Sequence, residues 1–72
     1  MTRDDLRGLK PGASIVHACT GRLYVYEGWI ERGGGYVSPC VELRGAVRWV
    51  EDLVVDEDVF LDEYRILSTV VL

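Results

Sequence analysis

Turn-forming residues interrupt this chain so often that no stretch between them has room for a helical crossover. Pro11–Gly12, Thr20–Gly21, Gly33–Gly35 and Gly45 divide residues 1–45 into short segments. Glycine and proline break regular elements, and parallel strands need a connection of a dozen or more residues. We therefore expect the strands to be antiparallel and joined by tight turns.

The segments between the turns have the composition and alternation of half-buried strands. β-Branched and aromatic side chains fit a pleated surface, and they are frequent in these segments. We expect strands at residues 13–19, 22–30, 36–44, 46–50 and 64–71. Gly33–Gly35 should form a hairpin tip, and Pro39 indicates an edge or a bulge because it lacks a ladder donor. Five short antiparallel strands predict an all-β domain, a small barrel or roll.

Helical structure is expected only in short pieces. Residues 1–8 predict a frayed helical turn capped by Thr2, with Asp5 as the acid of a capping box. A second short helical turn is expected near residues 51–54. The apolar side chains of residues 57–71 fit a helical spacing as well as a strand, and β-branched Thr69–Val71 favours a strand from Tyr64.

The composition predicts one folded domain spanning residues 1–72. Hydrophobic residues make up 49% of the chain and charged residues 28%, which argues against intrinsic disorder. Seven of the 12 acidic side chains lie in residues 51–72, where one arginine opposes them. With a net charge of −4, non-specific attraction to duplex DNA should be weak.

Two segments resemble the opening hairpin of Src-homology-3-like and Tudor-like small barrels. They are Leu9–His17, with its Pro-Gly before the strand, and Gly21–Gly28, with its aromatics. Trp49–Leu53 looks like the end-of-strand and helical-turn segment of those domains. The chain is also similar to short uncharacterised bacterial and phage domains that pair an early His-containing strand with a late Trp-Val. The resemblance implies a Src-homology-3-like barrel. The acidic specificity loop and clustered groove aromatics of the peptide-binding members are missing, so proline-rich recognition is not carried over.

His17, Cys19 and Cys40 are the weak candidates for a metal site. His17 and Cys19 share one face of a strand, and Cys40 lies nearby if the first and third strands are neighbours. Zinc takes four ligands of this kind, and a carboxylate could complete the set, but no Cys-x-x-Cys pair is present. We therefore predict no cofactor and no bound metal.

The two cysteines suggest no catalysis either. A Cys19–Cys40 disulfide is not expected in a reducing compartment. A nucleophilic Cys19 activated by His17 would need a third group to orient the imidazole, and none is obvious. We predict that the protein is not an enzyme.

The remaining features favour a non-enzymatic module for protein–protein binding or self-association. The candidate binding residues form an Arg/Tyr face: Arg22, Tyr24, Tyr26, Tyr36, Arg44 and Arg48. The candidate self-association residues lie in an apolar edge strand: Ser68, Val70, Val71 and Leu72. The alternative function is a nucleic-acid-associated barrel that uses the Arg/Tyr face.

The expected partner is another protein chain or a second copy, and no membrane is expected. No apolar run reaches the roughly 20 residues that cross a bilayer. The start of the sequence lacks the basic and apolar stretches of a signal peptide. We therefore expect a cytoplasmic protein.

Overall fold

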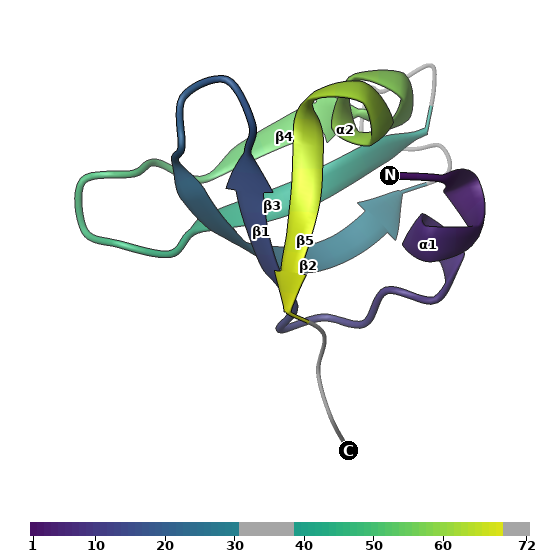
Figure 1. Cartoon of the computed structure of the whole chain (residues 1–72). Helices are drawn as coiled ribbons and strands as arrows, with labels where there is room; N and C mark the ends of the chain where they lie inside the picture. Colours follow the sequence, from purple (N-terminus) through teal and green to yellow (C-terminus); the bar gives the residue numbers. More distant parts are fainter. Residues whose placement is uncertain (31–38, 69–72) are drawn as a thin grey trace.

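The computed structural model of the chain, which describes residues 1–30 and 39–68, is mainly β. Its elements in chain order are α1 (Arg3–Arg7), β1 (Ser14–His17), β2 (Leu23–Ile30), β3 (Cys40–Gly45), β4 (Leu53–Asp56), α2 (Glu57–Glu63) and β5 (Tyr64–Ser68) (Figure 1). The five strands form one antiparallel sheet, as the short connections predict.

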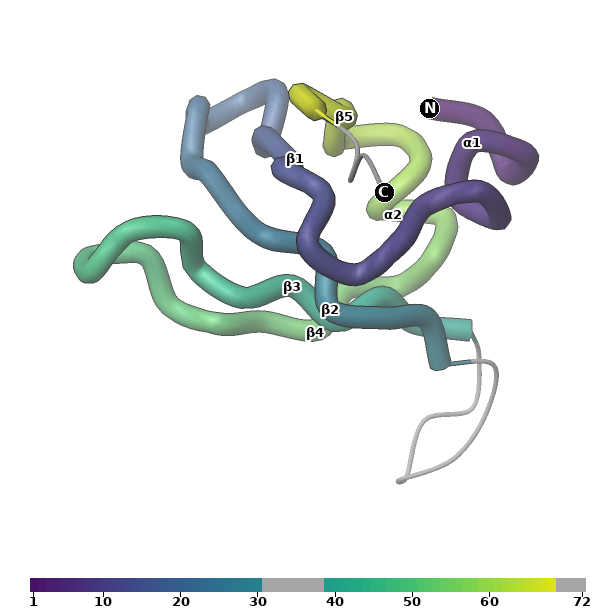
Figure 2. The backbone as a smooth tube through the Cα atoms, turned by 90° about the horizontal axis from the view of Figure 1, so that it is seen from below, coloured from purple at the N-terminus to yellow at the C-terminus, as the bar shows by residue number. Residues whose placement is uncertain are grey.

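The strand order is β4-β3-β2-β1-β5, so the last strand pairs with the first. Among the described residues the sheet does not close, and β4 and β5 are its edges. In Figure 2 the sheet bends, with β1 and β5 on one side and β3 and β4 on the other. A register shift between Tyr26 and Gly28 accompanies this bend in β2, since a bulge bends the strand that carries it.

The hydrophobic core fills the concave side of this bent sheet. Its fully buried large side chains are Ile15, Val41, Leu43 and Phe60. Phe60 comes from α2 and stacks on Tyr64, with ring centroids 5.6 Å apart. α2 therefore packs Phe60 into the core, while Asp58 and Asp62 are exposed.

The capping box at the N-terminus is confirmed, and α1 is anchored by its apolar residues. The Asp5 N–H donates to Thr2 Oγ1 (3.2 Å), and the Thr2 N–H donates to Asp5 Oδ2 (3.0 Å). Hydrogen bonds from the backbone and the side chain of Thr2 to the Asp5 carboxyl lower its pKa, so acid weakens this cap. Leu6 and Leu9 are buried in the core, which ties α1 to the sheet.

The predictions for residues 46–54 are wrong. Residues 46–50 form a turn rather than a strand, and the Val50 N–H donates to the Val47 oxygen at 3.1 Å. Strand β4 occupies Leu53–Asp56, where a helical turn was expected. The reason is register: Leu53 pairs with Leu43 and Val55 with Val41, so the alternating apolar residues of β4 follow the buried ones of β3.

Residues 57–68 combine the two alternatives that the sequence left open. Glu57–Glu63 is helical, and the strand begins at Tyr64 as predicted. Three parts of the expected hairpin and strands lie outside the described residues. They are Gly33–Gly35, residues 36–38 of the expected third strand and residues 69–71 of the expected last strand. None of the helices in the described ranges has the length and apolar character needed to span a membrane.

Candidate functional site

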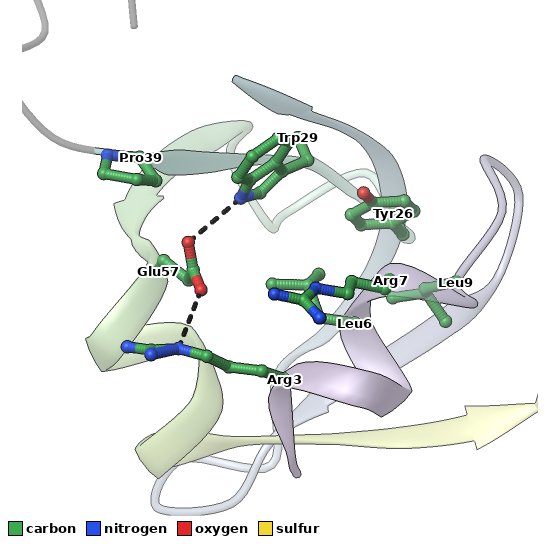
Figure 3. Close-up of a pocket in the computed structure, with 8 residues that line it drawn as sticks. All are labelled: Arg3, Leu6, Arg7, Leu9, Tyr26, Trp29, Pro39 and Glu57. Atoms are coloured by element: carbon green, nitrogen blue, oxygen red, sulfur yellow. Dashed lines mark hydrogen bonds and ion pairs between the residues drawn. The ribbon is translucent and has the colours of Figure 1, made fainter. Parts of the chain in front are cut away.

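A groove of about 630 Å³ lies between α1, β2 and the first residue of α2 (Figure 3). Each of these elements contributes to its walls. The lining residues are Arg3, Leu6, Arg7, Leu9, Tyr26, Trp29, Pro39 and Glu57. The groove therefore joins residues that are far apart in the sequence, from Arg3 to Glu57.

Glu57 links the two walls of this groove. The Trp29 indole N–H donates to Glu57 Oε2 at 3.1 Å, and Arg3 Nε donates to Glu57 Oε1 at 3.2 Å (Figure 3). A second Arg3 nitrogen lies 2.9 Å from Asp58 Oδ1. These bonds hold the edge of the indole in place, while Trp29 remains 46% exposed.

The floor of the groove is apolar and its rim carries a cation. Leu6, Leu9 and Tyr26 are buried, and burial raises the pKa of the Tyr26 phenol. The Arg7 side chain is 78% exposed and touches Asp4 Oδ1 only at 3.8 Å. An exposed pair of this kind is worth about 0–1 kcal/mol, so the Arg7 guanidinium can exchange it for another carboxylate.

The predicted Arg/Tyr face is wrong for Tyr24 and Tyr26, which are each 3% exposed. Tyr24 packs edge-on against Tyr64, with ring centroids 5.9 Å apart. Because the rings of Tyr24 and Tyr26 both face the core, they have no surface on which a base could stack.

The other members of that face are exposed, paired with an acid or outside the described residues. Arg22 and Arg48 are exposed, Arg44 donates to Glu27 Oε1 at 2.6 Å, and Tyr36 lies outside the described residues. Among the described residues, the exposed aromatics are instead Trp29 in the groove and Trp49 in the β3–β4 turn, which is 82% exposed. Simple alternation would place Trp29 on the opposite side of β2 from Tyr26. The register shift between Tyr26 and Gly28 brings it to the same side, with Trp29 opposite Val41 and Tyr26 opposite Leu43.

The proposed self-association residues are only partly described. Ser68 ends β5, which is an edge of the sheet, and pairs with Ser14. Val70, Val71 and Leu72 lie outside the described residues. Self-association through this segment stays a prediction.

The three metal-site candidates do not come together as a set. Cys40 is buried at the start of β3, where its thiol donates to Asp56 Oδ1 at 3.9 Å. His17 and Cys19 instead meet Glu63 at the end of α2. The sequence interpretation allowed for a carboxylate ligand without identifying it. The pairing of β1 with β5 identifies Glu63, because His17 lies opposite Tyr64, the residue that follows Glu63.

The two cysteines should differ sharply in reactivity. Burial, and then the nearby Asp56 carboxylate, raises the pKa of the Cys40 thiol, which keeps it protonated. Cys19 is exposed. We expect iodoacetamide to alkylate Cys19 about 100-fold faster than Cys40, whose reaction waits for an opening of the fold.

Peptide mass spectrometry after timed alkylation measures both rates. Alkylation in denaturant is the control, and there the two rates should converge. Equal rates in the native protein would contradict the buried position of Cys40.

Comparison with known proteins gives no relationship to build on. No model of a protein family matches the chain, and neither does any curated protein or solved structure.

Proposed function

We propose that the protein is a non-enzymatic interaction module whose groove binds a short apolar segment of another protein. That segment carries an acidic side chain beside its apolar residues. The observation that carries this proposal is the exposed face of Trp29, whose indole N–H is held by Glu57. This face lies beside the apolar floor of the groove and the Arg7 guanidinium.

The composition of the groove supports protein binding. Tryptophan, tyrosine and arginine dominate the residues that contribute most to protein interfaces. The groove presents the side chains of Trp29, Arg3 and Arg7, and the buried Tyr26 forms part of its floor. Because Glu57 bonds to both Trp29 and Arg3, two of these side chains are already ordered, and binding costs less entropy.

Charge indicates which apolar segment fits. The Arg3 guanidinium is engaged by Glu57 and Asp58, whereas Arg7 has only a long contact with Asp4. The charge that the groove offers to a ligand is therefore positive, although the chain carries −4 overall. A carboxylate beside the apolar residues of the ligand would bond to Arg7.

A Src-homology-3-like fold is part of this proposal. The strand order, the pairing of the first strand with the last and the helix between β4 and β5 support it. The nucleic-acid alternative is less favoured, since the burial of Tyr24 and Tyr26 removes its stacking residues.

Selection from a random peptide library displayed on phage tests the proposal. We expect the selected peptides to combine aromatic or branched aliphatic residues with Asp or Glu. Trp29→Ala and Arg7→Glu should each weaken binding about 30-fold in fluorescence polarisation, as hot-spot substitutions of about 2 kcal/mol do.

The chain provides a matched control for each variant. Trp49→Ala and Arg48→Glu make the same two chemical changes in the β3–β4 turn, which lies away from α1 (Figure 1). Both controls should bind within about twofold of the unchanged protein, as surface changes usually do. Selected peptides that bind Trp29→Ala as tightly as the unchanged protein, or a selection without binders, would overturn the proposal.

A further inference from the structure

The end of β1 and the turn that follows it bring two side chains with metal-binding atoms against a third from the end of α2. They are His17, Cys19 and Glu63, and their ligand atoms all lie within 4.8 Å of one another. None of the three lines the groove described above. A function of this cluster is therefore separate from peptide binding.

His17 is held between two oxygen atoms. Its Nδ1 lies 2.8 Å from Thr20 Oγ1, and its Nε2 lies 3.0 Å from Glu63 Oε1. Without a metal, one tautomer donates Nε2–H to Glu63 and the other donates Nδ1–H to Thr20. In the second tautomer the Nε2 lone pair faces Glu63 Oε1, so that a cation can bind both atoms. The Nδ1–H bond to Thr20 then orients the ring, as outer hydrogen-bond partners of metal-bound histidines do.

The backbone around the cluster is fixed by hydrogen bonds. The Ala18 N–H donates to the backbone carbonyl oxygen of Glu63 at 2.9 Å, which ties the turn to the end of α2. The Gly21 N–H donates to the His17 oxygen at 2.8 Å, and Gly21 has a φ of 74°, which favours glycine. The His17 ring also packs against Tyr64, with centroids 4.6 Å apart.

We propose that His17 Nε2, Cys19 Sγ and a Glu63 carboxylate oxygen bind one Zn²⁺ ion, with water as the fourth ligand. Nitrogen, thiolate sulfur and carboxylate oxygen are the ligands that zinc takes. Zinc bond lengths of about 2.0–2.3 Å place tetrahedral ligand atoms about 3.3–3.6 Å apart. The 4.8 Å limit of this cluster is more than 1 Å wider, and the 3.0 Å between His17 Nε2 and Glu63 Oε1 is slightly shorter. Zinc binding therefore needs the exposed Cys19 side chain to rotate inward and the Glu63 carboxylate to move back slightly.

Such an ion would tie the first hairpin to the last helix and strand. His17 and Glu63 are 46 positions apart in sequence. Domains as small as this one often need a metal or cross-link in addition to their core. Zinc binding should therefore raise the melting temperature.

The test adds Zn²⁺ or Co²⁺ to protein stripped with a chelator. We expect one ion per chain by titration calorimetry, a higher melting temperature, and the thiolate-to-cobalt charge-transfer and tetrahedral d–d absorption bands with Co²⁺. Cys19→Ser and Glu63→Gln should each weaken Zn²⁺ binding more than about 100-fold. Loss of a residue that only hydrogen-bonds to a metal ligand weakens binding less than that.

Asp62→Asn is the matched control, since it also removes one carboxylate from the end of α2 but lies outside the cluster. It should bind Zn²⁺ like the unchanged protein. The inference is overturned if the unchanged protein fails to bind Zn²⁺, if Cys19→Ser binds as tightly as it does, or if Asp62→Asn weakens binding as much as Glu63→Gln.

Discussion

Replacing Phe60 with alanine is expected to remove a large share of the free energy of unfolding at 25 °C. The Phe60 side chain is fully buried and contacts two aromatic rings, with its centroid 5.6 Å from that of Tyr64 and 6.3 Å from that of Tyr26. Removing a buried phenylalanine costs about 4 kcal/mol, because it loses burial and leaves a cavity. A chain of this length has a free energy of unfolding of about 4–10 kcal/mol.

Urea denaturation followed by tyrosine and tryptophan fluorescence measures this loss. Val59→Ala is the matched control, because Val59 precedes Phe60 on α2 and is exposed. It should change the free energy of unfolding by less than about 0.5 kcal/mol. A Phe60→Ala protein within about 1 kcal/mol of the unchanged one would contradict the position of α2 against the sheet.

Gly45→Ala should produce the second large loss, at the end of β3. An added Cβ would overlap the carbonyl oxygen of Val50 and lie 2.6 Å from its carbonyl carbon. Both neighbours are backbone atoms, so no side-chain rotation relieves the clash. We expect a cost of about 3 kcal/mol, the upper part of the range for overpacking.

Gly28→Ala is the control for this substitution. Gly28 also lies in a strand, but its added Cβ would have no neighbouring atom within 4 Å. Its free energy of unfolding should stay within about 1 kcal/mol of the unchanged value. Equal losses for the two alanine variants, compared by urea denaturation, would contradict the tight turn between Gly45 and Val50.

Local patterns in the sequence predict the local structure of this protein. The capping box of Thr2 and Asp5 is a short-range motif, and it forms as expected. Turn residues and alternation likewise predict antiparallel strands, and the structure confirms them. Propensity fails at residues 46–56, because β-prone Val47 and Trp49 lie in a turn while pairing with β3 selects Leu53–Asp56 as the strand.

Which face of a strand is buried depends on a distant element. Alternation places Tyr24 and Tyr26 on one side of β2, but it does not identify the inner side, and it misses the register shift that brings Trp29 to the side of Tyr26. Phe60 on α2 packs over the tyrosine side, with its ring centroid 6.3 Å from that of Tyr26. No pattern within β2 carries that information, so the sequence interpretation chose the wrong surface.

The two candidate sites depend on contacts between distant positions. Trp29 meets Glu57 across 28 positions, and His17 meets Glu63 across 46. Residue types alone identified His17 and Cys19 as metal-binding candidates. Their third partner, and the whole groove, follow only from the order of strands in the sheet.

The indole N–H signals in nitrogen-15 NMR spectra test the groove most directly. The chain has two tryptophans, and the spectrum of Trp49→Ala assigns the signal of Trp29. On titration with a selected peptide that carries apolar and acidic side chains, the Trp29 indole signal should shift and saturate, while that of Trp49 stays in place. A shift at Trp49 alone, or at neither indole while the peptide binds, would contradict binding in the groove.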